Sequence, residues 1–138
     1  MRHRFIIFLT LIILLALACG AKSEADNSTR EDWKTNVALW HEYRSKLIFA
    51  ATETTSRTGE KEMSLIANNR DVLISIFKRL KLDGVPSMNE KRGTILRMID
   101  KAPGGNRVAM SEKLATDISS FWDEVLKYAE KYGVSSGG

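Results

Sequence analysis

The sequence has few of the residues on which small exported domains and metal proteins depend. Its 138 residues include one cysteine, two prolines and two histidines. A single cysteine forms no intramolecular disulfide, and structural zinc sites need about four cysteine or histidine ligands. We therefore expect no cysteine/histidine metal site and no bound cofactor, and we expect the fold to depend on side-chain packing.

A long hydrophobic run is also absent. The most apolar stretch, residues 5–18, has 14 residues, whereas a helix that crosses the bilayer core needs about 20. Arg2 and Arg4 precede this stretch, and Ala16 and Ala18 lie at its end. A basic start, an apolar run of about 7–15 residues and small residues at the cut are typical of a secretory signal peptide. We therefore interpret residues 1–18 as a signal peptide that is removed.

The residue after this run makes the interpretation more specific. Residues 15–19 read Leu-Ala-Leu-Ala-Cys, which resembles the lipobox of bacterial lipoproteins. In that family the cysteine sulfur receives a diacylglyceryl group, the signal is cut just before the cysteine, and the new amino terminus is often acylated. The resemblance covers residues 1–20 only; Ala16 and Leu17 depart from the preferred residues. It implies that Cys19 carries lipid and attaches the protein to a membrane.

Residues 19–28 connect this anchor to the rest of the chain. After Cys19 they are mostly small and polar without a repeating pattern, so we expect a flexible tether. By resemblance to enterobacterial lipoproteins, the absence of aspartate at Gly20 favours the outer membrane over retention at the inner membrane. We expect a lipid-anchored protein of the bacterial cell envelope, with its body facing the periplasm or the cell surface.

Charge of one sign is not in large excess. The chain has 21 basic and 17 acidic residues, and the loss of Arg2 and Arg4 with the signal peptide lowers its formal net charge from +4 to +2. Nucleic-acid-binding domains show a strongly basic face, so we expect no nucleic-acid partner. The sequence also lacks a nucleophile elbow, a Walker loop and a His-Glu-x-x-His helix, and we expect that the protein is not an enzyme.

Apolar residues recur at helical spacing over most of the remaining chain. The spacing predicts four helices, over residues 28 to about 58, 60–82, 88–101, and from 108 or 111 to 132. No strand-like alternation is evident. The predicted fold is all-α, an antiparallel four-helix bundle with a short third helix, over residues 29–133. Residues 134–138 are expected to form a disordered tail.

Five polar residues fall near the apolar centre of their predicted helices: Arg44, Asn69, Arg70, Asp117 and Glu124. A charge that is buried has to be paired. One interpretation is a layer of salt bridges that fixes the register of the helices. The other is a polar pocket that binds a small molecule. We favour the first, because nothing in the sequence predicts a cavity.

Three apolar residues are candidates for a partner-binding face: Phe49, Trp122 and Leu126. Phe49 lies almost opposite the apolar stripe of its predicted helix, and the other two flank the core side of the last helix. Exposed apolar patches mark interaction sites. We also weighed Trp33, Trp40, His41 and Tyr43 as a cofactor box. The seven-residue spacing of the tryptophans indicates core packing instead.

These observations lead to one functional hypothesis and two alternatives. The hypothesis is a lipid-anchored envelope protein whose helical domain acts by binding another envelope protein. The first alternative is a helical bundle that binds a small molecule or cofactor through the polar layer, with Arg44, Arg70, Asp117 and Glu124 as its binding residues. The second is an inhibitor or exclusion lipoprotein that blocks an incoming hydrolase or phage. It requires a protruding loop, and residues 102–107 are the candidate.

Overall fold

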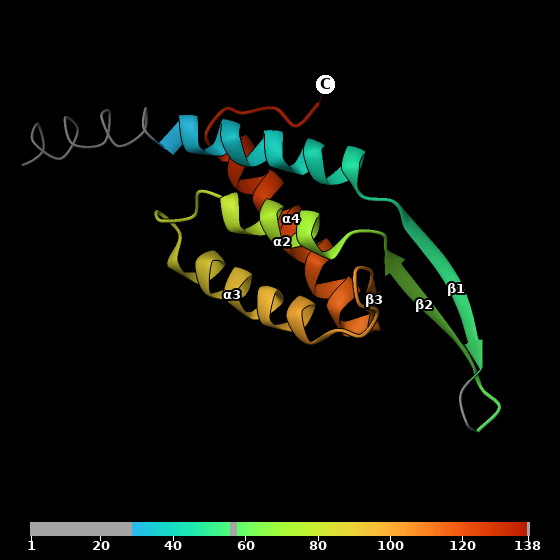
Figure 1. Cartoon of the computed structure of the whole chain (residues 1–138). Coiled ribbons are helices and arrows are strands. Elements are labelled where there is room, and N and C mark those ends of the chain that lie inside the picture. The colour runs from blue at the N-terminus through green and yellow to red at the C-terminus, as the bar shows by residue number, and fades with distance from the viewer. Residues whose placement is uncertain (1–28, 56–57, 138) are drawn as a thin grey trace, which may run out of the picture.

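The computed structural model describes residues 29–55 and 58–137 (Figure 1). The expected signal peptide, Cys19 and the tether of residues 19–28 lie outside the described residues. The described residues form four helices and a small antiparallel sheet of three strands. The prediction of an all-α four-helix bundle is therefore wrong, and the fold is α+β.

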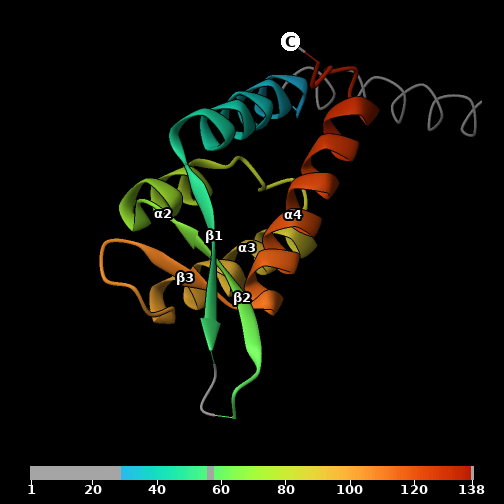
Figure 2. The same ribbon diagram turned by 90° about the vertical axis from the view of Figure 1, so that its right-hand side faces the viewer.

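The elements follow one another in a simple order. They are a helix over residues 29–46, β1 (Phe49–Thr55), β2 (Lys61–Ala67), α2 (Arg70–Arg79), α3 (Pro86–Lys101), β3 (Val108–Met110) and α4 (Glu112–Lys131). β1 and β2 form an antiparallel hairpin, and β3 pairs with the last three residues of β2. Both views show the hairpin extending past the helices (Figure 2).

The hairpin occupies the region predicted to end the first helix and begin the second. Several residues of β1 are threonines, whose β-branched side chains favour strands. Gly59, between the strands, has φ 84°, which suits glycine in a turn. The outer part of the hairpin extends past the helices (Figure 2), and its sequence lacks the apolar–polar alternation by which strands are recognised.

Side-chain caps explain two of the helix starts. Asn69, predicted within a helix, is extended and precedes α2, and its Oδ1 accepts a hydrogen bond from the Val72 N–H at 3.2 Å. Ser111 caps α4 in the same way: its Oγ accepts a hydrogen bond from the Leu114 N–H at 3.1 Å. Such caps satisfy amide groups that have no partner within the helix. Asn69 is therefore a capping residue and not a member of a buried polar layer.

The end of α4 packs onto the body instead of fraying. Gly133 has φ 74° and donates its N–H to the Glu130 carbonyl at 2.9 Å, and Val134 donates to the Ala129 carbonyl at 2.8 Å. These two hydrogen bonds form a Schellman motif. Val134, the first residue of the expected disordered tail, is buried in the core.

The core lies where the four helices meet the base of the hairpin. Its largest fully buried side chains include Trp33, Leu73, Ile76, Phe77, Phe121 and Ile99. Trp33 stacks on Tyr128 of α4 with ring centroids 5.2 Å apart and an interplanar angle of 8°. Buried aromatic side chains remove large areas of apolar surface from water, and they dominate the energetics of protein cores. Trp33 therefore holds the helix of residues 29–46 against α4.

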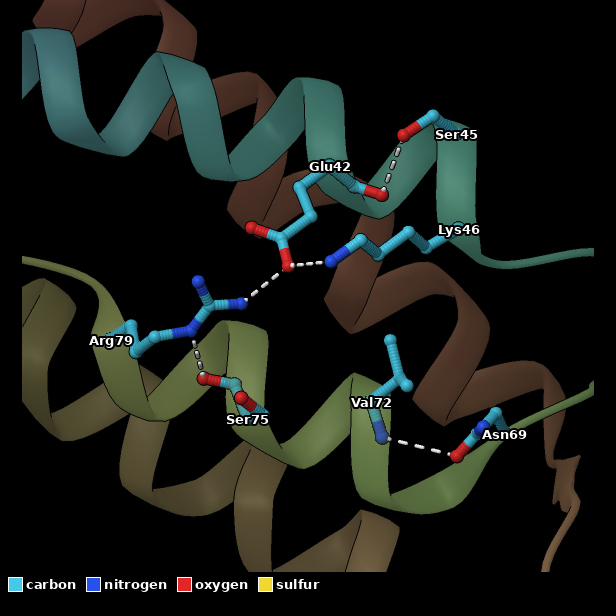
Figure 3. Close-up of polar contacts among 7 residues, drawn as sticks. All are labelled: Glu42, Ser45, Lys46, Asn69, Val72, Ser75 and Arg79. Carbon is cyan, nitrogen blue, oxygen red and sulfur yellow. Dashed lines mark hydrogen bonds and ion pairs between the residues drawn. The ribbon is translucent and has the colours of Figure 1, made fainter.

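An ion-pair cluster joins the same helix to α2. Glu42 Oε1 lies 2.6 Å from Arg79 Nη2 and 2.8 Å from Lys46 Nζ (Figure 3). The hydrogen bond from Arg79, followed by that from Lys46, lowers the pKa of Glu42 from 4.5 to about 2. A carboxyl whose pKa is lower in the folded chain stabilises the fold above its unfolded pKa, and this contribution disappears as the pH falls toward 2.

We expect Glu42→Gln to reduce the pH dependence of stability. At pH 6 the variant should be less stable than the parent by up to about 1 kcal/mol, because the pair lies near the surface and is screened. The difference should shrink as the pH falls from 4.5 to 2. Urea unfolding followed by circular dichroism at pH 6, 4 and 2.5 measures it. Glu31→Gln, which removes an ion pair with Lys34 inside one helix, is the control. A Glu42→Gln difference that stays constant across these pH values contradicts the prediction.

Candidate functional site

The five residues predicted to form a polar layer do not meet in the structure. Arg44 is exposed and lies over the ring of Trp40, with its Cζ 4.7 Å from the ring centroid. Asn69 caps α2, and Arg70 contacts the loop after α3. Asp117 and Glu124 line one groove, and Arg44 lines another. The residues therefore serve separate local structures.

Arg70 is the most extensively bonded of the five. Its guanidinium group donates to the backbone carbonyl oxygens of Ile99, Asp100 (3.3 Å), Ala102 (2.5 Å), Pro103 (3.4 Å), Gly105 (2.7 Å) and Arg107 (3.0 Å). A positive group at the end of α3 also complements the helix dipole. Arg70 thus caps α3 and holds the loop that follows.

This loop, residues 102–107, was the candidate for a protruding inhibitory element. Besides its contacts with Arg70, it requires glycine: Gly104 has φ 123°, and a Cβ atom there would lie 2.7 Å from the Arg107 carbonyl oxygen. The loop is solvent-exposed but tied to the body. The element that extends farthest from the helices is instead the β1–β2 hairpin (Figures 1 and 2).

Asp117 and Glu124 line a shallow groove of about 440 Å³ between α3 and α4. Asp117 pairs with Lys113 at 2.8 Å, and Glu124 pairs with Lys91 at 2.6 Å. Both carboxylates are thus already neutralised by neighbouring ammonium groups. In the described ranges, 29–55 and 58–137, no group of three or more histidine, cysteine, aspartate or glutamate side chains is placed to hold a metal ion.

A second groove, of about 450 Å³, has a different character and is the candidate functional site. It opens between helix 29–46, the face of the sheet and α4. The residues that line it are Trp40, Tyr43, Arg44, Phe49, Leu65, Met110, Ala115, Ile118, Ser119, Trp122 and Asp123. We call it the aromatic groove. It joins Phe49 and Trp122, which the sequence predicted as part of one face, with Arg44.

Ring contacts form the wall of the aromatic groove. The ring centroid of Tyr43 lies 5.4 Å from that of Phe49 and 5.0 Å from that of Trp122. Tilted pairs at such distances are favourable beyond the area that they bury. Burial raises the pKa of Tyr43 to about 12, so its hydroxyl stays protonated near neutral pH. The wall is therefore closely packed and uncharged.

Two opposite charges flank this wall. Arg44 and Asp123 both line the groove and are solvent-exposed. Within the part of the chain that the structure describes, neither forms an ion pair. Trp122 is 3% exposed, and its Nε1–H has no acceptor among the described residues. An apolar surface bordered by unpaired charges suits a ligand that has polar groups at its ends.

The other residues singled out in the sequence lie elsewhere. Leu126, one turn after Trp122, is half-buried and does not line the aromatic groove. Trp33 is in the core, and His41 is exposed beside Trp40, with ring centroids 5.0 Å apart. Leu65 and Met110 were missed as groove residues, because only strand pairing brings them to this face.

None of the helices in residues 29–55 and 58–137 is both long and apolar enough to cross a membrane. Comparison of the chain with protein-family models, with curated proteins and with solved structures finds no match.

Proposed function

We propose that the chain is a lipid-anchored protein of the bacterial envelope whose domain, residues 29–133, binds another envelope protein. The lipobox-like sequence at residues 15–19 supports the anchor at Cys19. The aromatic groove supports the binding role. The proposal assigns no catalytic step to the chain. It favours the outer membrane because the residue after Cys19 is glycine and not aspartate.

The single observation that carries the proposal is the composition of the aromatic groove. Tryptophan, tyrosine and arginine are the residues most enriched in the energetically dominant parts of protein interfaces, and Trp40, Tyr43 and Arg44 lie together here. Half-buried aromatic rings leave apolar surface for a partner to cover. The adjacent hairpin extends from the body and adds accessible surface beside the groove (Figure 2).

Photo-crosslinking in intact cells tests the binding role. Benzoylphenylalanine at Ser119, which is exposed and lines the groove, is expected to crosslink to a protein. The same group at Lys78, exposed on α2 and away from the groove lining, is the matched control and should not crosslink. The additional change Arg44→Glu should weaken the Ser119 crosslink. Absence of any protein adduct from Ser119 contradicts the proposal.

The anchor has its own test. Cys19→Ser is expected to release the protein from the membrane fraction and to abolish incorporation of radiolabelled palmitate. It should also remove the Ser119 crosslink if the partner resides at the membrane. A Cys19→Ser protein that remains membrane-bound and normally processed contradicts the lipid anchor.

The volume of the groove supports a second candidate, the binding of a small apolar molecule. About 450 Å³ lies within the usual range for small-ligand sites, about 300–1,000 Å³. In that case Ser119 would give no protein adduct. A ligand extracted with the purified full-length protein would instead raise its thermal unfolding midpoint when added back, and Arg44→Glu would alter that shift.

A further inference from the structure

β1 is an edge strand with a free side. The sheet order is β1-β2-β3, so only β2 pairs with β1 among the described residues. One step beyond the Phe49–Ala67 pair, the Asn68 N–H donates to the Ile48 carbonyl at 3.1 Å. Hydrogen-bonded and non-hydrogen-bonded pairs alternate along antiparallel strands. The residues whose N–H and C=O groups point away from β2 are therefore Phe49, Ala51, Glu53 and Thr55.

This edge carries little protection against pairing. Natural edge strands are usually blocked by proline, by lysine, by a bulge or by a covering segment. β1 contains neither proline nor lysine, and its pairing with β2 is continuous over seven residues. Its one charge, Glu53, is paired with Lys61 at 2.8 Å. The edge is thus open to another strand.

The free edge and the aromatic groove meet at Phe49. Phe49 is the first residue of β1, and its ring contributes to the groove beside Tyr43. Side chains of paired strands that lie opposite one another share a face of the sheet. A strand added along β1 therefore directs the side chain opposite Phe49 toward the aromatic groove. Ile48, just before this point, is 68% exposed and offers further apolar surface.

We propose that β1 binds an extended segment of a partner protein by antiparallel strand addition, with a large apolar side chain of that segment in the aromatic groove. This inference rests on the proposed function and specifies how the partner is held. Main-chain hydrogen bonds provide affinity in such complexes, and pockets for alternate side chains provide specificity. The antiparallel direction continues the existing sheet and places the carboxyl-terminal end of the segment at Phe49 and the groove.

Charge complementarity defines a second feature of the segment. Arg44 lies in the same groove, is exposed, and has no carboxylate partner among the described residues. An aspartate or glutamate side chain after the apolar residue would reach this guanidinium group. Stacking on Trp40 holds Arg44 in place, which reduces the entropy lost when the ion pair forms.

A second copy of the chain fits this surface poorly. Of the residues of β1, Ala51 and Glu53 share the groove-facing side of the sheet with Phe49, so pairing of β1 with β1 would bring one of these three to each groove, and Phe49 already packs on its own Tyr43 at 5.4 Å. Alanine is too small, and glutamate too polar, to fill an apolar groove of about 450 Å³. A heterologous segment with its own large apolar residue satisfies both the edge and the groove.

Selection from a displayed library of random nine-residue peptides tests the inference, with the full-length protein in detergent as the target. Enriched peptides are expected to share one large apolar residue followed within two positions by aspartate or glutamate. N-methylation of alternate backbone amides in a selected peptide should weaken binding at least tenfold, whereas methylation of the intervening amides should not. Arg44→Glu should weaken binding at least tenfold and shift the selected preference to lysine or arginine. Arg97→Glu, an exposed arginine of α3, is the control.

A proline scan of β1 separates this inference from the proposed function. Ala51→Pro removes an outward N–H and should abolish peptide binding with little change in unfolding midpoint, since proline is tolerated on edge strands. Ala50→Pro removes an inward N–H and should lower the midpoint. Retention of the Ser119 crosslink in Ala51→Pro cells overturns strand addition while leaving the proposed binding role in place. Failure to select any peptide, equal effects of both methylation patterns, or a dimer that Ala51→Pro dissociates also overturns it.

Discussion

Replacing Arg70 by methionine is expected to lower the free energy of unfolding by about 3 kcal/mol or more. Hydrogen bonds to a charged donor contribute about 1.5–3 kcal/mol, and carbonyl groups left without a donor add a desolvation cost. Arg70 holds the end of α3 through Ile99 and Asp100, and the following loop through Gly105 and Arg107. Methionine is close in length to the aliphatic stem of arginine and keeps apolar contacts of that stem, so the loss reports on the guanidinium group. Urea unfolding of the full-length protein measures it.

Two controls sharpen this prediction. Arg70→Lys keeps the positive charge at the end of α3 but has no planar fork of donors, so it should recover only part of the loss. Arg97→Met removes an exposed arginine on α3 that bonds only to Thr94 among the described residues, and should change stability by about 0.5 kcal/mol or less. An Arg70→Met protein as stable as the parent contradicts the role of Arg70 as a clamp.

Replacing Asn36 by leucine is expected to lower the free energy of unfolding by about 2–4 kcal/mol, because it leaves buried backbone groups without hydrogen bonds. Asn36 is the polar side chain that is fully buried among the described residues. Its amide group pairs with the backbone of Lys81 in both directions, Nδ2 donating to the carbonyl at 2.9 Å and Oδ1 accepting from the N–H at 2.7 Å. Leucine has a similar volume but leaves both backbone groups unpaired. The substitution should therefore loosen the segment between α2 and α3.

Amide hydrogen exchange gives this prediction a local readout. The Lys81 N–H should lose protection in Asn36→Leu by more than the change in global stability requires, because its acceptor is removed. Thr35→Leu, at the neighbouring exposed position on the same helix, is the control. It should leave the exchange rate of the Lys81 N–H unchanged and the free energy of unfolding within about 0.5 kcal/mol of the parent value. Unchanged protection of Lys81 in Asn36→Leu contradicts the prediction.

Asn69 and Arg70 show how a sequence pattern identifies an unusual residue without identifying its role. Both were conspicuous because they are polar residues within an apparently continuous apolar helix. The helix in fact begins at Arg70, so Asn69 is its cap and Arg70 turns toward the end of α3. The local sequence alone does not tell a capping residue from a residue in the middle of a helix; the two are distinguished only when the start of the helix is known. The start was misplaced because the preceding β2 has residues with good helix propensity.

The aromatic groove could be predicted only in part. Phe49 was conspicuous because a helical wheel left it opposite the core, and Trp122 because it flanked an apolar stripe. Their meeting across Tyr43 depends on the change from helix to strand before Phe49. The sequence assigns Arg44 to the polar layer because it falls near the apolar centre of its helix, whereas in the structure it lies over Trp40 and lines the groove. No local signal places Leu65 and Met110 at this surface, because their proximity is created by pairing between distant strands.

The sequence by itself determined that helices cover residues 29–46, 70–79, 86–101 and 112–131, and that α4 ends at Gly133, because these features depend on neighbouring residues; it did not determine where the first helix ends or where α2 begins. The single cysteine likewise limits the domain to stabilisation by packing, and its lipidation stays a prediction from residues 1–20. Only the tertiary structure decided that residues 49–67 form a hairpin. Alanine, glutamate and lysine there are compatible with a helix, and pairing with β3 and packing on α4 overcome that weak preference. The free edge and the groove beside it follow from that choice.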